Sequence, residues 1–249
     1  MKVKALILDT LKRRKMHMTL LDPAKQPIPT AGDISERAFA AGTDAIMVGG
    51  STGVTQENLD RTVDEIKDRC PLPVIYFPSG ANAIAKRCDA VYFMSMLNSR
   101  NVRNLTGEQW KGAPIIKSLG LEPISMGYIV IEPGMKVGEI GEADVVARND
   151  LSRAVGYAIA AEFFGMALVY LEAGSGAPQP VPEEMVQEVS KSVSIPVIAG
   201  GGITSPEHAK VLCRAGADIV VTGTLVEDGD FETPLREIVE TVHGTKTRS

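Results

Sequence analysis

Residues 196–203 read Pro196-Val197-Ile198-Ala199-Gly200-Gly201-Gly202-Ile203, an apolar run that ends in three consecutive glycines. A second run of the same kind, Asp218-Ile219-Val220-Val221-Thr222-Gly223-Thr224, follows it along the chain. Short runs rich in Val and Ile are typical of strands that are buried on both faces of a parallel sheet. Strands seven and eight of a (β/α)8 barrel often end in turns of this type, and these turns often bind phosphate.

Six further apolar runs precede these two strands, and helical patterns separate most of them. The six runs cover residues 18–23, 45–50, 73–78, 90–95, 124–131 and 167–172. Helices are predicted at residues 34–41, 56–70, 151–164, 182–192 and 234–243, with Asn149 or Asp150 as the N-cap of the third of these. This alternation predicts an α/β fold, a single (β/α)8 TIM barrel, and the 249 residues of the chain match the usual length of that fold.

One helix of the barrel has little room. Only about ten residues separate the third and fourth predicted strands, whereas a crossover between parallel strands usually needs a dozen or more. We therefore expect a reduced or missing third helix. No break in composition divides residues 1–249, which are predicted to form one domain with an N-terminal helix or arm over 1–15 and a frayed tail over 244–249. The basic cluster at residues 12–15 is expected to be exposed.

Charge and composition exclude several classes of protein. The net charge is −5 and no long basic run occurs, which argues against nucleic-acid binding. The three cysteines form no CxxC pair, which fits a reducing, cytoplasmic location. No apolar run approaches the roughly 18 residues of a membrane span, so an integral membrane protein is not expected. The HExxH, P-loop and GxSxG motifs are also absent from the sequence.

The glycine turns after strands seven and eight predict a phosphate site. Glycine lets the backbone approach an anion closely, so that its N–H groups become donors. A short helix that begins near Leu225 would add donors of the same kind. The alternative interpretation is that these glycines only form tight turns.

Strand six ends in Glu172, beside the predicted phosphate site. Tyr170 and Glu172 are two residues apart and therefore point to the same side of the strand. A carboxylate at the barrel mouth suits a base that acts on a substrate hydroxyl. The alternative role for Glu172 is an internal ion pair with a lysine such as Lys117.

Asp22 ends strand one and Ser51 follows strand two, which places an acid and a hydroxyl on the same rim. Mg²⁺ favours few carboxylates together with substrate phosphate oxygens, so this pair is a candidate metal site. Asp22 with Pro23 could instead simply terminate the strand.

The chain resembles the geranylgeranylglyceryl phosphate synthase family, which includes the related heptaprenylglyceryl phosphate synthases. The resemblance covers nearly the whole chain. Its most specific motifs are Leu20-Leu21-Asp22-Pro23, Val48-Gly49-Gly50-Ser51, Tyr170-Leu171-Glu172-Ala173-Gly174-Ser175-Gly176, Gly200-Gly201-Gly202-Ile203 and Thr222-Gly223-Thr224.

The resemblance implies a Mg²⁺-dependent prenyltransferase of archaeal ether-lipid synthesis that joins sn-glycerol 1-phosphate to geranylgeranyl diphosphate. It implies Asp22 and Ser51 as Mg²⁺ ligands, Glu172 as the catalytic residue and a homo-oligomeric assembly. The lipid product would draw such an enzyme towards a membrane surface. The implied glycerol phosphate contacts are Tyr170, Leu171, Glu172, Ala173, Gly174, Ser175, Gly176, Gly201, Gly202, Gly223 and Thr224.

A prenyl tail also needs a long apolar groove. Candidates on strands three to five are Tyr76, Val91, Phe93 and Ile129, each of which could equally belong to the barrel core. Trp110 could be an exposed interface residue or a core residue. Two other functions stay open: another phosphate-binding barrel enzyme, similar to thiamin-phosphate synthase, and a non-catalytic sensor of a phosphorylated metabolite.

Overall fold

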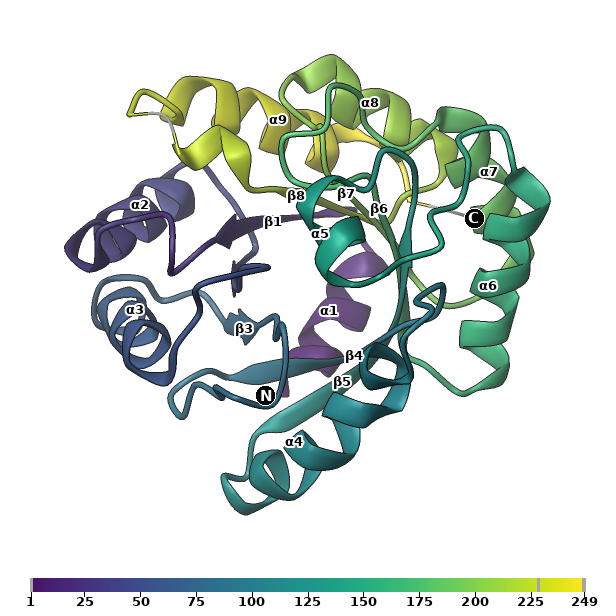
Figure 1. Ribbon diagram of the computed structural model, residues 1–249. Helices are drawn as coiled ribbons and strands as arrows, with labels where there is room; N and C mark the ends of the chain where they lie inside the picture. The colour runs from purple at the N-terminus through teal and green to yellow at the C-terminus, as the bar shows by residue number, and fades with distance from the viewer. Residues whose placement is uncertain (1, 228, 248–249) are drawn as a thin grey trace.

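Eight parallel strands close into a barrel in the order of the chain, with β8 paired to β1 (Figure 1). The computed structural model describes residues 2–227 and 229–247. The predicted TIM barrel is confirmed. The strands are β1 (Met16–Leu21), β2 (Ala45–Val48), β3 (Val74–Tyr76), β4 (Ala90–Met96), β5 (Glu122–Val130), β6 (Leu168–Glu172), β7 (Val197–Gly200) and β8 (Ile219–Thr222).

Helices surround the strands, and most of them connect one strand to the next (Figure 1). The helices are α1 (Val3–Leu11), α2 (Ile28–Ala40), α3 (Gln56–Arg69), the π-helix η1 (Arg103–Gly107), α4 (Glu108–Ser118), α5 (Met135–Ile140), α6 (Leu151–Phe163), α7 (Glu183–Ser192), α8 (Pro206–Ala215), the 3-10 helix η2 (Thr224–Glu227) and α9 (Glu232–Gly244).

Local capping sets several of these helix starts. Thr55 and Asn58 form a reciprocal capping box at α3, and the Asp150 side chain accepts from the backbone N–H of Arg153 at α6. Asp150 is therefore the N-cap of α6, and it is one of the two residues that the sequence predicts for this role. Helix α2 begins at Ile28, earlier than the predicted residue 34, because Pro27 precedes it and a second proline occupies its first turn.

No helix lies between β3 and β4, whose connecting residues 77–89 are all described. The chain instead returns close to β3: the Tyr76 hydroxyl donates to the carbonyl of Ala83, and the backbone N–H of Asp89 donates to the carbonyl of Val74. The ring of helices is therefore interrupted between α3 and α4 (Figure 1), which confirms the expected loss of the third helix.

Successive side chains of each strand point alternately into the barrel and out towards the helices, so the core has an inner layer and an outer layer. Met18, Met47 and Tyr170 belong to the cluster that fills the barrel, whereas Val48 and Leu171 pack outwards against helices. This alternation decides which side chains reach the mouth of the barrel.

The N-terminal end of the barrel corrects the expectation for the basic cluster. Helix α1 packs Val3 and Ile7 against the inner layer. Lys15 is 1% exposed and donates from Nζ to the carbonyl of Ala217, and Arg14 pairs with Asp44 at 2.5 Å. Only part of the cluster is therefore exposed, because β1 begins at Met16 and draws the preceding residues into the barrel base. Of the predicted tail, residues 248–249 lie outside the described residues.

Candidate active site

A cleft at the carboxyl ends of β6, β7 and β8 brings together most of the predicted phosphate contacts. Its lining includes Tyr170, Glu172, Ser175, Gly176, Gly201, Gly202, Gly223 and Thr224. None of the described residues that line it is Lys, Arg or His. An anion in this cleft would therefore be held by backbone N–H groups and hydroxyls rather than by a cationic side chain.

Glycine is required where the β7 turn approaches β6. Gly201 has φ +82, and a Cβ atom there would lie 2.5 Å from Oε1 of Glu172 and 2.6 Å from the backbone nitrogen of Gly174. The hydroxyls of Ser175 and Thr224, 3.1 Å apart, join the β6 loop to the β8 loop. The three loops thus line one continuous cleft.

Leu171 and Ala173 are placed differently from the other residues of the predicted 170–176 segment. Their side chains belong to the outer layer, where they pack towards α6 and α7, because they alternate with the inward-facing Tyr170 and Glu172. Any contact of these two residues with a ligand would be made through the backbone. Gly174 contributes its backbone N–H to Glu172.

Glu172 is a buried carboxylate that faces the barrel mouth. It is 7% exposed, accepts a 2.7 Å hydrogen bond from Gly174, and interacts with the hydroxyls of Tyr128 and Tyr170. Burial raises its pKa above the ordinary value for Glu, although these hydrogen bonds partly oppose the shift. Lys117 is exposed at the end of α4, and no ion pair joins it to Glu172 among the described residues, so the ion-pair alternative finds no support.

Asp22 and Ser51 lie on the neighbouring part of the rim. The Asp22 carboxylate packs directly against Gly50, where a Cβ atom would collide with it, so Asp22 lies beside the turn that carries Ser51. It accepts a 2.9 Å hydrogen bond from the backbone N–H of Ala24, and burial raises its pKa. Among the described residues, no three His, Cys, Asp or Glu side chains form a group that could hold a metal ion.

These donors fit Mg²⁺ only in part. A half-buried carboxylate and an adjacent hydroxyl could supply part of an oxygen shell, and Mg²⁺ often completes such a shell with substrate phosphate oxygens and water. Burial is the main cause of the raised pKa of Asp22, and Lys25 partly opposes it.

A central cleft joins the two sides of the rim. It is lined by Gly50 and Ser51 on one side, by Glu172 and Ser175 on the other, and by Phe77 and Tyr128 between them. At its outer edge it shares Pro78, Ser79, Met94 and Asn104 with an adjoining apolar groove. The two cavities are therefore continuous.

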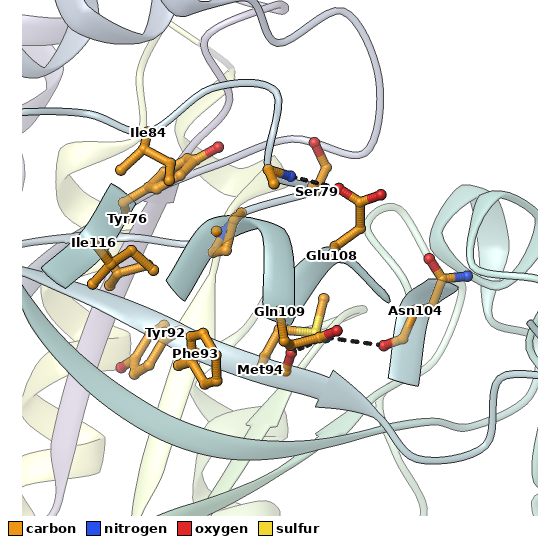
Figure 2. Close-up of a pocket in the computed structure, with 15 residues that line it drawn as sticks. Tyr76, Ser79, Ile84, Tyr92, Phe93, Met94, Asn104, Glu108, Gln109 and Ile116 are labelled. Carbon is orange, nitrogen blue, oxygen red and sulfur yellow. Dashed lines mark hydrogen bonds between the residues drawn. The ribbon is translucent and has the colours of Figure 1, made fainter. Parts of the chain in front are cut away.

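The apolar groove occupies the gap left by the missing helix (Figure 2). Tyr76, Val91 and Phe93 line it, as the sequence predicts for a prenyl tail, and Ile84 and Ile116 face them from the 77–89 connection and α4. Ile129 takes the alternative position, in the barrel core. It also points outwards, but α6 covers the outer face of β5, so Ile129 is buried in the outer core.

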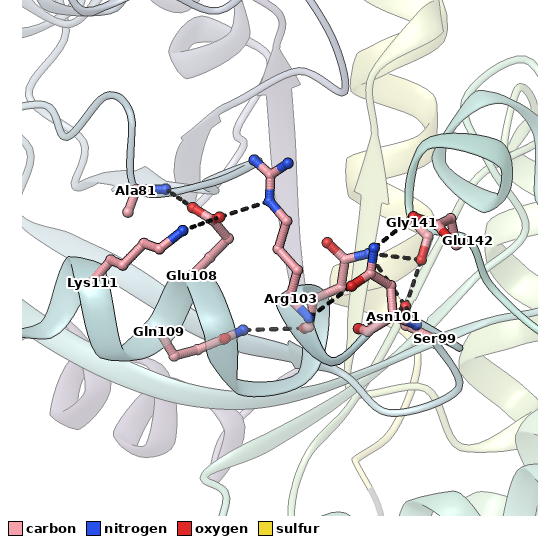
Figure 3. Close-up of polar contacts among 10 residues, drawn as sticks. Ala81, Ser99, Asn101, Arg103, Glu108, Gln109, Lys111, Gly141 and Glu142 are labelled. Atoms are coloured by element: carbon pink, nitrogen blue, oxygen red, sulfur yellow. Dashed lines mark hydrogen bonds and ion pairs between the residues drawn. The ribbon is translucent and has the colours of Figure 1, made fainter.

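Polar contacts fix η1 and α4 beside this groove (Figure 3). Glu108 accepts from the backbone N–H of Ala81 and from Nε of Arg103, each at 2.7 Å, and these contacts lower its pKa. Gln109 donates to the carbonyl of Met94, and Asn104 donates to the carbonyl of Gly141. Trp110 on the outer face of α4 is 69% exposed and is not a core residue.

The comparisons with known proteins agree with this geometry. The model of the PcrB family matches residues 9–242. The chain belongs to the PcrB family. It is 49% identical to a geranylgeranylglyceryl phosphate synthase of Thermococcus gammatolerans over 98% of each chain, and 47% identical to one of Picrophilus torridus over 95% of this chain and 98% of the other.

Solved structures place this PcrB-family chain in the same group. A (S)-3-O-geranylgeranylglyceryl phosphate synthase of Thermoplasma acidophilum, in complex with its substrate sn-glycerol-1-phosphate, has a TM-score of 0.95 and 44% identity over 98% of this chain and 99% of the other. A thiamine phosphate pyrophosphorylase of Pyrococcus furiosus is 15% identical over 93% of this chain and 97% of the other, with a TM-score of 0.60. The second likeness shows a shared fold alone.

Sequence reasoning missed Phe77, Tyr128, Asn104 and Glu108 as site residues. Tyr128 could have been found, because it pairs with Tyr170 in the β5–β6 register and therefore faces the same side. Phe77 directly follows β3, at the strand end where barrel sites lie. Asn104 and Glu108 had no comparable signal, since they belong to helices that the sequence pattern did not predict.

Proposed function

We propose that this chain joins sn-glycerol 1-phosphate to geranylgeranyl diphosphate and releases diphosphate. The observation that carries the proposal is the convergence of two cavities on one carboxylate. The glycine-lined cleft and the cleft that continues into the apolar groove are both lined by Glu172. A small phosphate ester and a long apolar chain could therefore meet at this residue.

The glycine turns would hold the phosphate of the glycerol substrate and leave its free hydroxyl directed at Glu172. The raised pKa of Glu172 makes it a stronger base than an exposed carboxylate. Glu172 would take the hydroxyl proton as the oxygen attacks the first carbon of the prenyl chain. The carbon–oxygen bond to diphosphate breaks, and its electron pair leaves with diphosphate.

Asp22 and Ser51 would hold Mg²⁺, which supplies charge neutralisation to the diphosphate when it is bound. The groove between β3, β4 and α4 would bury the prenyl tail and keep water from the reacting carbon. A homo-oligomeric state is a further proposal, and light scattering of the purified chain tests it.

The decisive experiment incubates the purified chain with labelled sn-glycerol 1-phosphate, geranylgeranyl diphosphate and Mg²⁺, and extracts the lipid product. We expect a labelled prenyl ether that does not form with sn-glycerol 3-phosphate. The Glu172→Gln variant should form it at least about 10²-fold more slowly. A parallel reaction with the precursors of thiamin phosphate tests the other barrel enzyme. Tight binding of glycerol phosphate without any product would favour a sensor.

A further inference from the structure

Four aromatic rings meet at the inner wall of the central cleft. The Phe77 ring centroid lies 5.8 Å from that of Tyr92, 5.4 Å from that of Tyr128 and 5.9 Å from that of Tyr170. The three tyrosines are buried, whereas Phe77 is only half-buried and lines the cleft. Phe77 is thus the most exposed ring of this cluster, and Tyr128 and Tyr170 line the cleft beside it.

Phe77 lies between the candidate base and the candidate diphosphate site. On one side it contacts Tyr128 and Tyr170, the two phenols that interact with Glu172. On the other side its backbone packs so closely against Gly49 that a Cβ atom there would collide with the Phe77 carbonyl. The next residue, Gly50, packs against the carboxylate of Asp22.

The central cleft also suits positive charge. Among the described residues that line it, Glu172 is the only charged side chain, and Lys, Arg and His are absent. Polarisable side chains make up much of the remaining wall, including Met47, Met94 and Met96. A cation in this cleft would meet one carboxylate, aromatic faces and sulfur atoms.

We propose that the face of Phe77 stabilises the positive charge that develops on the first carbon of the prenyl chain. This inference rests on the proposed function. As the bond from this carbon to diphosphate breaks, its electron pair leaves with diphosphate and the allylic carbon becomes cationic. The glycerol oxygen then forms the new bond and its proton passes to Glu172. The negative face of an aromatic ring attracts a cation within about 6 Å of its centroid, most strongly where water is excluded.

The test replaces Phe77 with phenylalanines that carry one, two or three ring fluorines. Each fluorine withdraws electron density from the ring face and changes its size little. We expect the single-turnover rate to fall stepwise with each fluorine, by about tenfold to thirtyfold in all, with unchanged affinity for prenyl diphosphate. Phe77→Tyr should keep most of the rate, and Phe77→Leu should lose at least as much as the trifluorinated variant.

The matched control is the same fluorinated series at Phe39, which lies on α2 and lines neither the apolar groove nor either cleft. Its rates should stay within about twofold of the wild type. A flat series at Phe77, or an equal decline at both positions, would overturn the proposal while leaving the synthase activity established. Absence of product from the wild-type chain would instead reject the proposed function itself. Melting temperatures of all variants identify any that fail to fold.

Discussion

The Oε1 atom of Glu172 accepts a 2.7 Å hydrogen bond from the backbone N–H of Gly174, two residues further along the chain. The loop that follows β6 therefore holds the carboxylate that ends the strand. Because Ser175 and Gly176 of the same loop line the phosphate cleft, the candidate base is connected directly to part of the anion site. A ligand that orders this loop would also orient Glu172.

Glu172→Gln should lower kcat by about 10²-fold or more, since the amide keeps the shape but not the basicity. Burial raises the pKa of Glu172, so wild-type kcat/KM should rise with pH through a value above the ordinary 4.5 of Glu, and the variant should lack this limb. The ionised form is the costly one in the fold, so the variant should melt no lower than the wild type at neutral pH. A near-normal kcat would show that Glu172 is not the base.

Gly201→Ala should weaken the binding of glycerol phosphate at least tenfold, a loss of about 1.4 kcal/mol, and Gly201→Val should weaken it further. The added Cβ would displace Glu172 and Gly174. Gly165→Ala is the matched control, because Gly165 also has positive φ (+74) but nothing lies within 4 Å of its Cβ position. Calorimetric titration with glycerol phosphate measures both variants. Equal affinities would remove the β7 turn from the binding site.

Asp22→Asn should raise the Mg²⁺ concentration needed for half-maximal turnover and leave glycerol phosphate binding nearly intact. The amide retains the oxygen but loses the charge that attracts a divalent cation. Asp9→Asn removes the same charge from α1 at the opposite end of the barrel and should leave the Mg²⁺ dependence unchanged. Wild-type activity that is indifferent to chelators would show that the metal assignment is wrong.

The pH dependence of stability should depend on His17, which is fully buried and bonded to the hydroxyls of Thr43 and Thr222. Burial lowers its pKa from 6.5 to about 3, so between these values the unfolded chain binds a proton that the folded chain does not. The free energy of unfolding should therefore fall with decreasing pH in this window, by up to about 1.4 kcal/mol per pH unit. Urea titrations at several pH values measure this free energy for the wild type and for His17→Gln. The free energy should change less steeply with pH in the variant, and an equal pH dependence in both proteins would contradict the assignment.

The strands were predictable because eight short apolar runs, separated mostly by helical patterns, are compatible with few other folds. Helices α4 and α5 were not predictable, because Pro114 and several glycines interrupt their helical sequence pattern. Helix α4 is stabilised instead by tertiary contacts, such as the hydrogen bond from Ala81 to Glu108. The glycine turns and Glu172 follow from the rule that barrel sites lie at strand ends. Ile129 stayed open between groove and core at the level of sequence, because the sequence shows that a helix is missing but not which strands the gap uncovers.

The interruption in the ring of helices changes the direction from which the barrel can be filled. Most barrel cavities open along the axis, so the barrel's diameter limits how much of a ligand lies deep within it. Here the groove leads from the central cleft over the ends of β3 and β4 to their outer face. A ligand could therefore lie radially, with its reactive end at the axis and its remainder in the wall. The length of ligand that can be bound then no longer depends on the width of the barrel. Residues 80–89 and α4, which line the groove but not the central cleft, can vary without disturbing the chemistry at Glu172.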